Sequence, residues 1–383
     1  MAKARVTIKD IAEAVNVSPR AVSAALNGTG RISRAMRERI QQTAREMNYR
    51  PNMLARGLVQ QRTYLVGVVI PYVSNSFFSR ILHGIEERSV AEGFDILLGN
   101  SEAVSNEHED RSLERMINRN VDGVICSPSP KAYRTYLRLK EHGVPVLQLM
   151  RAAEGLDAPY LGVDDVHGGY LATRHLIDLG HRAVGFLSHH DSEYAAIRNR
   201  RDGFFQAFLE RGLSCDFSRW IEPGTLSVED GFRAAAQLLD RAPEITAIFA
   251  ATDYAAIGAI KACLAAGLRV PGDISVIGYD DIDLAANQID YPLTTVAQPK
   301  ERIGQQAFDL LLRLMGAEQG NGRTDGSADT GNTAGDGERA SDGTPAGDGE
   351  PASDEDGAEA GPGADRWLER PELIIRETCA ARG

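Results

Sequence analysis

The sequence has few residues of the kinds that mark disulfide-rich or membrane proteins. Its four cysteines are far apart, with no Cys-x-x-Cys pair and no companion histidines, so we expect reduced thiols and no zinc site. No apolar run approaches the roughly 20 residues that span a bilayer. The amino end also lacks the apolar core of a signal peptide, so we expect a cytoplasmic protein that makes no membrane contact.

Motifs of the common catalytic and nucleotide-binding sites are missing too. The chain has no Gly-x-Gly-x-x-Gly and no Gly-x-x-x-x-Gly-Lys. None of its eight histidines stands in a zinc-like or triad-like setting. We therefore expect no enzyme activity, no cofactor and no metal site.

Charge is distributed very unevenly along the chain. Residues 1–62 carry twelve Lys or Arg against four Asp or Glu, although the whole chain has a net charge of −12. The low-complexity stretch 318–365 holds thirteen acidic residues against two arginines, and its composition predicts a disordered insert because it has too little apolar surface to bury. The basic amino end has the charge expected of a DNA-binding segment.

Three short helices are predicted in this basic segment. Thr7 and Asp10 form a capping-box pattern before the first, Ser18-Pro19 opens the second, and Ser33 begins the third, which stops at Pro51. Two helices joined by a tight turn, with a third closing the core, fit a helix-turn-helix whose second helix enters the major groove. A three-helix bundle without a DNA-binding role is the alternative.

Three segments of this region resemble the LacI/GalR (lactose/galactose repressor) family of bacterial transcriptional regulators. They are Val-Thr-Ile-Lys-Asp-Ile-Ala from Val6, Val-Ser-Pro-Arg-Ala-Val-Ser-Ala-Ala-Leu-Asn from Val17, and Asn-Tyr-Arg-Pro-Asn from Asn48. The resemblance implies a hinge after the head, with Leu58 wedged into a minor-groove base step, although ordinary linker packing is the alternative. DNA contacts are expected from Thr7, Ser18, Pro19, Arg20, Ser23, Asn27, Tyr49, Asn52, Ala55 and Leu58.

One departure from the family pattern concerns base reading. Ala24 stands where a long side chain is often found late on the recognition helix. Arg20 is then the best remaining candidate for reading guanine O6 and N7.

From Tyr64 onwards, apolar strand patterns alternate with helical ones, and the rhythm restarts after about 100 residues. This pattern predicts parallel, doubly wound sheets in two halves. The predicted strands are 64–70, 94–99, 121–127, 144–149, 183–187, 247–250, 274–277 and 371–375. The predicted helices are 77–91, 107–119, 132–142, 166–179, 194–210, 227–239, 254–266 and 299–315.

Such a pair of halves resembles the periplasmic sugar-binding fold that serves the repressor family as its effector domain. The resemblance therefore implies a small all-α helix-turn-helix head plus an α/β effector domain of periplasmic-binding-protein type, with two doubly wound parallel-sheet subdomains. The expected parts are the head (1–50), the hinge (51–62), a first subdomain (63–161 and 293–316), a second (162–292 and 366–383) and the disordered acidic insert (317–365).

Ligands of open α/β sheets bind beyond the carboxyl ends of the strands. On resemblance, Phe77 and Phe78 stack on an effector, Arg200 in an Arg-x-x-Gly-Phe pattern forks onto its hydroxyls or acids, and Asp280 accepts from it. The full expected set is Phe77, Phe78, Arg200, Leu226, Thr252, Asp253, Asp280 and Gln298. The phenylalanines could instead be core residues, Asp280 a turn residue and Arg200 a solvated helix residue.

These residues suit a sugar, because a carboxylate and a guanidinium bind hydroxyls while aromatic rings cover an apolar face. Thr252 in place of the usual asparagine, and Leu226 where some relatives have an aromatic, leave a nucleobase open. The resemblance also leaves open a phosphoprotein partner. We expect a repressor that binds a pseudo-palindromic DNA operator as a homodimer and responds to a small effector. Whether the effector releases or tightens DNA binding stays open.

Overall fold

The computed structural model describes residues 6–49, 62–73, 75–101, 106–129, 133–189, 194–214, 221–224, 227–287, 291–321 and 365–382. The chain divides into two compact units, Met1–Thr63 and Tyr64–Gly383. The predicted hinge contacts Asn52, Ala55 and Leu58 lie outside the described residues, as do Leu226, Cys215 and the interior of the acidic insert.

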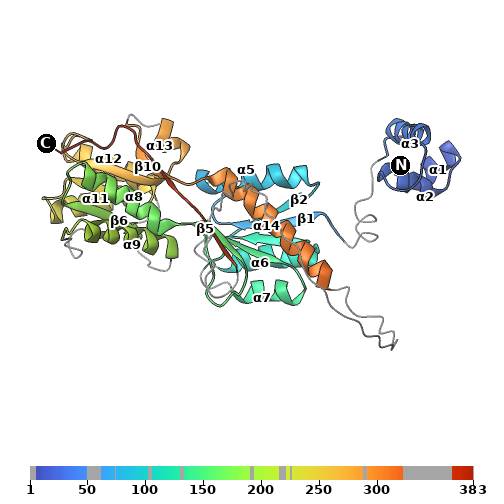
Figure 1. Ribbon diagram of the computed structural model, residues 1–383, viewed down its shortest axis with the longest axis horizontal. Helices are drawn as coiled ribbons and strands as arrows, with labels where there is room; N and C mark the ends of the chain where they lie inside the picture. The colour runs from blue at the N-terminus through green and yellow to red at the C-terminus, as the bar shows by residue number, and fades with distance from the viewer. Residues whose placement is uncertain are drawn as a thin grey trace, which may run out of the picture. The chain divides into compact units, whose positions relative to one another are not determined.

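The first unit is the predicted three-helix head, built from α1 (Ile8–Val15), α2 (Pro19–Leu26) and α3 (Arg34–Glu46) (Figure 1). Asp10 accepts from the Thr7 amide at 2.7 Å, and Ser18 accepts from the Ala21 amide at 3.2 Å, so the predicted caps are present. The apolar faces of the three helices meet in one small core that includes Ile11, Val22 and Ile40.

The second unit contains two six-stranded sheets, each flanked by helices. The first sheet has the order β11-β5-β4-β3-β1-β2, and all its strands are parallel. Its strands are β1 (Leu65–Ile70), β2 (Asp95–Asn100), β3 (Gly123–Cys126), β4 (Val146–Leu149), β5 (Tyr160–Val163) and β11 (Arg366–Glu369). Its helices are α5 (Ser76–Ala91), α6 (Asn106–Asn118), α7 (Tyr133–Glu141) and α14 (Lys300–Asn321).

The second sheet has the order β12-β10-β9-β8-β6-β7, with only the β10–β12 pair antiparallel. Its strands are β6 (Val184–His189), β7 (Ile221–Gly224), β8 (Ala247–Ala250), β9 (Ser275–Asp280), β10 (Thr294–Ala297) and β12 (Glu372–Ile374). Its helices are α8 (Asp165–Asp178), α9 (Ala195–Glu210), α11 (Val228–Arg241), α12 (Asp253–Ala265) and α13 (Asp283–Asn287). The predicted fold class, with two doubly wound sheets, is confirmed.

The chain passes between the halves after β5, β10 and β11. The first two crossings lie within a few residues of the predicted places near Leu161 and Leu293. The third was predicted after the helix 299–315, with the insert lying in it, but it follows the insert and β11. Strand β11 pairs in parallel with β5 in the first sheet, so the start of 366–383 does not belong to the second half. Helix α14 also continues to Asn321, into the start of the predicted insert 317–365. Figure 1 shows the C-terminal stretch, in dark red, running from the β5 region to the β10 region.

Helix α14 is held against the first half by a close crossing with α5. A Cβ built on Gly84 would lie 2.1 Å from the Glu301 carbonyl oxygen, and one built on Gly304 would lie 2.1 Å from the Ile81 carbonyl oxygen. Real Cβ atoms do not approach backbone so closely, so both positions need glycine for this packing. The crossing fixes a helix from the far end of the chain onto the half that contains β1.

The described cysteines are all reduced. Cys126 and Cys263 are fully buried and Cys379 is partly buried, as packed thiols should be. No helix in the described part of the chain is long and apolar enough to cross a membrane.

Candidate effector site

A cavity of about 140 Å³ lies between the two halves of the second unit. The first half contributes Asn75, Phe77, Phe78 and Arg151, among others. The second half contributes Asp165, Tyr194, Arg200, Thr252 and Asp280. Two further side chains, Tyr160 and Arg366, come from β5 and β11, the paired strands that lead into crossings. The cavity is therefore lined by both halves, so a bound molecule can change how they meet.

Arg200 of α9 forms the charged centre of this cavity. Its Nε donates to Asp165 Oδ1 at 2.8 Å, and its Nη1 lies 3.6 Å from Asp280 Oδ1 and donates to the Ala251 carbonyl at 2.6 Å. The guanidinium carbon lies 3.6 Å from the centre of the Tyr279 ring. The residues Arg200, Asp165, Asp280 and Tyr279 are each more than nine-tenths buried, so the arginine is fixed in place and is not a solvated helix residue.

Burial changes the protonation of the carboxylates around Arg200. It raises the pKa of Asp280 to about 6, although the positive charges of Arg200 and Lys300 act in the opposite direction. Burial also raises the pKa of Asp165, while Arg200 lowers it. The pKa of Arg200 lies above its ordinary value because its two carboxylate neighbours outweigh the effect of burial. Asp280 is thus a hydrogen-bond acceptor at neutral pH that gains a proton in mild acid.

Asp280 sits at the carboxyl end of β9 in an uncommon backbone conformation, with φ at +113°. Non-glycine residues in such conformations persist only where their surroundings hold them. Gln298 donates from Nε2 to Asp280 Oδ1 at 2.7 Å, and the Lys300 ammonium donates to the Asp280 and Asp281 carbonyls. The predicted effector residue Gln298 therefore lies behind Asp280 and positions it, and it does not line the cavity.

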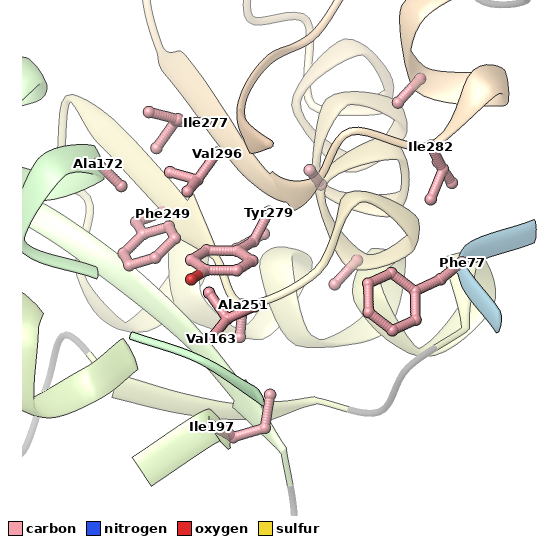
Figure 2. Close-up of a cluster of buried hydrophobic side chains, with 14 of the residues drawn as sticks. Phe77, Val163, Ala172, Ile197, Phe249, Ala251, Ile277, Tyr279, Ile282 and Val296 are labelled. Atoms are coloured by element: carbon pink, nitrogen blue, oxygen red, sulfur yellow. The ribbon is translucent and has the colours of Figure 1, made fainter. Parts of the chain in front are cut away.

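The aromatic side chains predicted to stack on an effector do line the cavity. Phe77 and Phe78 begin α5, where Asn75 accepts from the Phe77 amide at 2.9 Å, and their rings meet edge to face at 5.1 Å. Both are also largely buried, so the core interpretation of these residues holds as well. Figure 2 shows Phe77 in the same apolar cluster as Tyr279 and Ile282 of the second half.

The structure separates Thr252 from Asp253. Thr252 lines the cavity and caps α12 by accepting from the Ala255 amide. Asp253 is fully buried, accepts from the Ile282 amide at 2.8 Å and from the Thr295 hydroxyl at 2.5 Å, and is not part of the cavity lining. Asp253 therefore holds the loop after β9, and its predicted place in the effector site is not supported by the geometry. The position of Leu226 lies outside the described residues.

Several lining residues were missed in the sequence. Asp165, Arg151, Tyr194, Tyr160 and Arg366 belong to no motif that marked them. Arg151 and Asp165 stand two residues past the ends of β4 and β5, so the rule that ligands bind beyond the carboxyl ends of strands could have found both.

In the head, the predicted DNA-binding residues divide into two groups. Thr7 and Ser18 cap the starts of α1 and α2, and Pro19 is the first residue of α2. Tyr49 packs against the small core. Arg20 and Asn27 are exposed on α2, where the Asn27 amide donates to the half-buried Ser23 hydroxyl at 3.3 Å. Arg20 and Asn27 are therefore accessible from outside the head, whereas the roles of Thr7 and Ser18 within the head are to cap helices.

Two family models match the chain. One is described as periplasmic binding proteins and sugar binding domain of the LacI family and matches residues 63–332. The other, bacterial regulatory proteins of the lacI family, matches residues 7–52. The chain belongs to the LacI family.

Curated relatives that match this chain over most of their length are transcriptional repressors. The repressor PurR of Photobacterium profundum is 36% identical over 309 residues, which cover 80% of this chain and 91% of the relative. The repressor CytR of Escherichia coli K12 is 32% identical over 317 residues, which cover 82% of this chain and 92% of the relative. The protein is therefore a ligand-responsive, DNA-binding transcriptional regulator, and not an enzyme.

Solved structures of LacI-family proteins share the fold. The lac repressor dimer bound to operator and the anti-inducer ONPF matches with a TM-score of 0.76 at 24% identity, covering 99% of this chain and all of that one. The complex of the regulator CelR with cellobiose matches with a TM-score of 0.66 at 26% identity, and the match covers 98% of this chain and all of that one. Within the described residues, no group of His, Cys, Asp or Glu side chains is arranged to hold a metal ion.

Proposed function

We propose that the cavity binds a sugar or sugar derivative, and that binding changes the affinity of a homodimer for a pseudo-palindromic DNA operator. The observation that carries this proposal is Arg200, fixed by Asp165 beside the acceptor Asp280 in a cavity with aromatic walls. The protein would act in the cytoplasm, where the DNA is, as a repressor.

The chemistry of the cavity suits vicinal hydroxyls. An ionised Asp280 accepts from two neighbouring hydroxyls, and the fixed guanidinium of Arg200 donates to a hydroxyl oxygen. Phe78 and Phe77 offer apolar ring surface to the less polar face of a sugar. Gln298 and Lys300 hold the acceptor in place before a ligand arrives, which limits the ordering cost of binding.

The DNA contacts are proposed to follow the two-fold symmetry of such regulators. Two heads would occupy half-sites of the operator, each with Arg20 in the major groove, while residues 51–62 act as the hinge between head and effector domain. The resemblance places Asn52, Ala55 and Leu58 in that hinge, with Leu58 in the minor groove.

Ligand binding is proposed to act through the two halves of the effector domain. The cavity takes residues from both, so an occupant favours one relative arrangement over another. Two contacts already join the halves: Arg80 of α5 pairs with Asp283 of α13 at 2.9 Å, and the Ser76 hydroxyl lies 3.3 Å from that of Tyr254, which lines the cavity. A change in these contacts would carry the ligand signal to the start of β1 and the hinge that precedes it.

A nucleobase is the second candidate effector. The observation in its favour is the pair Phe77 and Phe78, because a flat aromatic ligand stacks on such rings, together with Thr252 in place of the asparagine usual in the family. A sugar is favoured because Arg200, Asp165 and Asp280 form a dense set of charged groups suited to several hydroxyls.

A thermal-shift screen of the full chain tests the proposal. The compounds are neutral sugars, sugar acids, sugar phosphates, nucleobases and nucleosides. A sugar-type compound should raise the unfolding temperature in wild type and fail to do so in Asp280→Asn. The exposed Glu301→Gln variant serves as a control that keeps the shift. A shift with nucleobases alone would replace the sugar with the second candidate, and no shift with any compound class would contradict the proposed site.

A further inference from the structure

Arg151 is a cation of the cavity without an anionic partner. It follows β4 in the first half, lines the cavity and is only partly exposed. Its guanidinium lies 4.4 Å from the centre of the Tyr194 ring and 6.0 Å from that of Phe78. Among the described residues its guanidinium makes no hydrogen bond and no ion pair, although two aromatic rings lie beside it.

A buried carboxylate of the first half, that of Glu109, already has hydrogen-bond partners. Glu109 is fully buried and accepts from the Ser129 hydroxyl at 2.6 Å and from the Tyr136 hydroxyl at 2.5 Å. Burial raises the pKa of Glu109, which favours its neutral form. Glu109 acts on Arg151 only through its charge, which raises the pKa of the arginine, and no ion pair joins the two side chains in the described part of the chain.

The contrast with Arg200 shows what is unusual about Arg151. Arg200 is balanced by Asp165 and Asp280, so that cluster leaves no excess positive charge. Arg366 also lines the cavity, with its guanidinium 4.7 Å from the Tyr160 ring centre and no carboxylate partner among the described residues. The described cavity lining thus carries three arginines against two aspartates.

An arginine held in a partly dry cavity without a counter-ion is costly for the unliganded protein. Burial lowers the pKa of Arg151, yet a guanidinium stays protonated at any physiological pH. A ligand carboxylate or phosphate would remove this cost and form two parallel hydrogen bonds with the fork of the guanidinium. Cation–π contact with Tyr194 orients the fork but cannot replace an anion.

We infer that the effector carries an acidic group, a carboxylate or a phosphate ester, that binds Arg151 of the first half. Its hydroxyls bind Arg200 and Asp280 of the second half, so one molecule joins the two halves through opposite ends. This inference rests on the proposed function, because it names the class of sugar derivative that the same cavity takes.

Matched pairs of neutral and acidic sugars test the inference with the full chain. The pairs are galactose with galacturonate, glucose with glucose 6-phosphate and ribose with ribose 5-phosphate, measured by isothermal titration calorimetry. At least one acidic member should bind ten times more tightly than its neutral partner, and the carboxylate and phosphate arms show which acid is read. Neutral members that bind as tightly as their acidic partners in all pairs would overturn the inference and leave the proposed function standing. A complete lack of binding in every pair would instead contradict the proposed function.

Variants of Arg151 separate charge reading from general binding. Arg151→Gln should weaken the preferred acidic sugar at least tenfold and leave its neutral partner unchanged. Arg151→Lys keeps the charge but loses the fork and should give an intermediate loss. Arg313→Gln, at an exposed arginine of α14, is the matched control and should bind like wild type. The unfolding temperature of unliganded Arg151→Gln should not fall, because the variant removes an unbalanced charge. Undiminished binding of the acidic sugar by folded Arg151→Gln would overturn the assignment.

Discussion

Arg200 and Asp165 form an ion pair with 2.8 Å between Nε and Oδ1, and both side chains are about 95% buried. This pair joins α9 to the start of α8 at the wall of the cavity. It also places the guanidinium next to Asp280, so the stability of the second half and the chemistry of the site depend on the same contact.

Removal of one partner of this pair should destabilise the fold. Arg200→Ala leaves the Asp165 carboxylate buried without a counter-ion, and such losses cost about 3 to 5 kcal/mol. The double variant Arg200→Met, Asp165→Asn removes both charges and should recover most of that free energy of unfolding. Urea unfolding followed by circular dichroism measures both. Equal stabilities of Arg200→Ala and wild type would show that the pair contributes little.

Effector binding should weaken in mild acid. Burial raises the pKa of Asp280 to about 6 from an ordinary value of 3.8, with Arg200, Lys300 and Asp165 as its charged neighbours. Below pH 6 the carboxylate takes a proton and no longer accepts from two hydroxyls, so Kd should rise by about fivefold between pH 6 and pH 5. The check is calorimetric titration from pH 5 to 7.5 with a neutral sugar that binds.

The same proton affects the stability of the unliganded protein in the opposite direction. A carboxyl whose pKa is raised in the folded state binds its proton more tightly there than in the unfolded chain. The contribution of Asp280 to stability is therefore complete below about pH 4 and is lost as the pH rises through about 6. Asp280→Asn should remove the contribution of Asp280 to the pH dependence of stability. A stability profile that is equally steep in Asp280→Asn would assign the titration to another group.

Helix α14 should tolerate alanine at Gly316 but not at Gly304, where it crosses α5. Gly304→Ala places a Cβ against the backbone of α5 and should lower the free energy of unfolding by about 2 kcal/mol or more. Gly316→Ala, on the same helix, meets nothing within 4 Å and should stabilise by up to about 1 kcal/mol through helix propensity. Thermal unfolding of the two variants provides the comparison. A destabilisation of the same size in both would mean that helix crossing is not the cause.

Arg20 should determine one base of the operator. It is exposed near the start of α2, on the face that the helix-turn-helix plan places in the major groove. Arg20→Ala should relax the preference at one position in each half-site by about 1 to 3 kcal/mol. Selection of binding sites from random DNA measures this, with Arg34→Ala, at an exposed arginine of α3, as a control that should leave the preferred base unchanged. An unchanged preference in Arg20→Ala would remove it from base reading.

Much of the fold was predictable because local signals agree with the global structure. Thr7 with Asp10, Ser18 and Ser33 all mark helix starts that the structure confirms. Strand β11 was missed because Arg366 to Glu369 is a short segment with a charged residue at each end, beside a long acidic insert, and its pairing with β5 spans some 200 residues. No local pattern reports a partner at that distance.

The candidate site was predictable in part for a related reason. Arg200 and Asp280 stand in recognisable patterns and line the cavity, whereas Asp253 follows Thr252 in sequence but turns into the core. Asp165 and Arg151 belong to no motif, and their roles depend on which side chains the two halves bring opposite them. Such contacts follow from the three crossings of the chain, which the sequence placed only approximately.

Operator binding with and without an effector tests the central claim most directly. The full chain is titrated onto a fluorescent operator, taken from the random-DNA selection, with and without the sugar derivative that gives the largest thermal shift. Coupling between the cavity and the head should change the Kd for DNA by about 5- to 150-fold at saturating ligand. The same ligand should leave the Kd of Asp280→Asn unchanged. An operator Kd that stays the same in wild type, while the ligand demonstrably fills the cavity, would contradict the account.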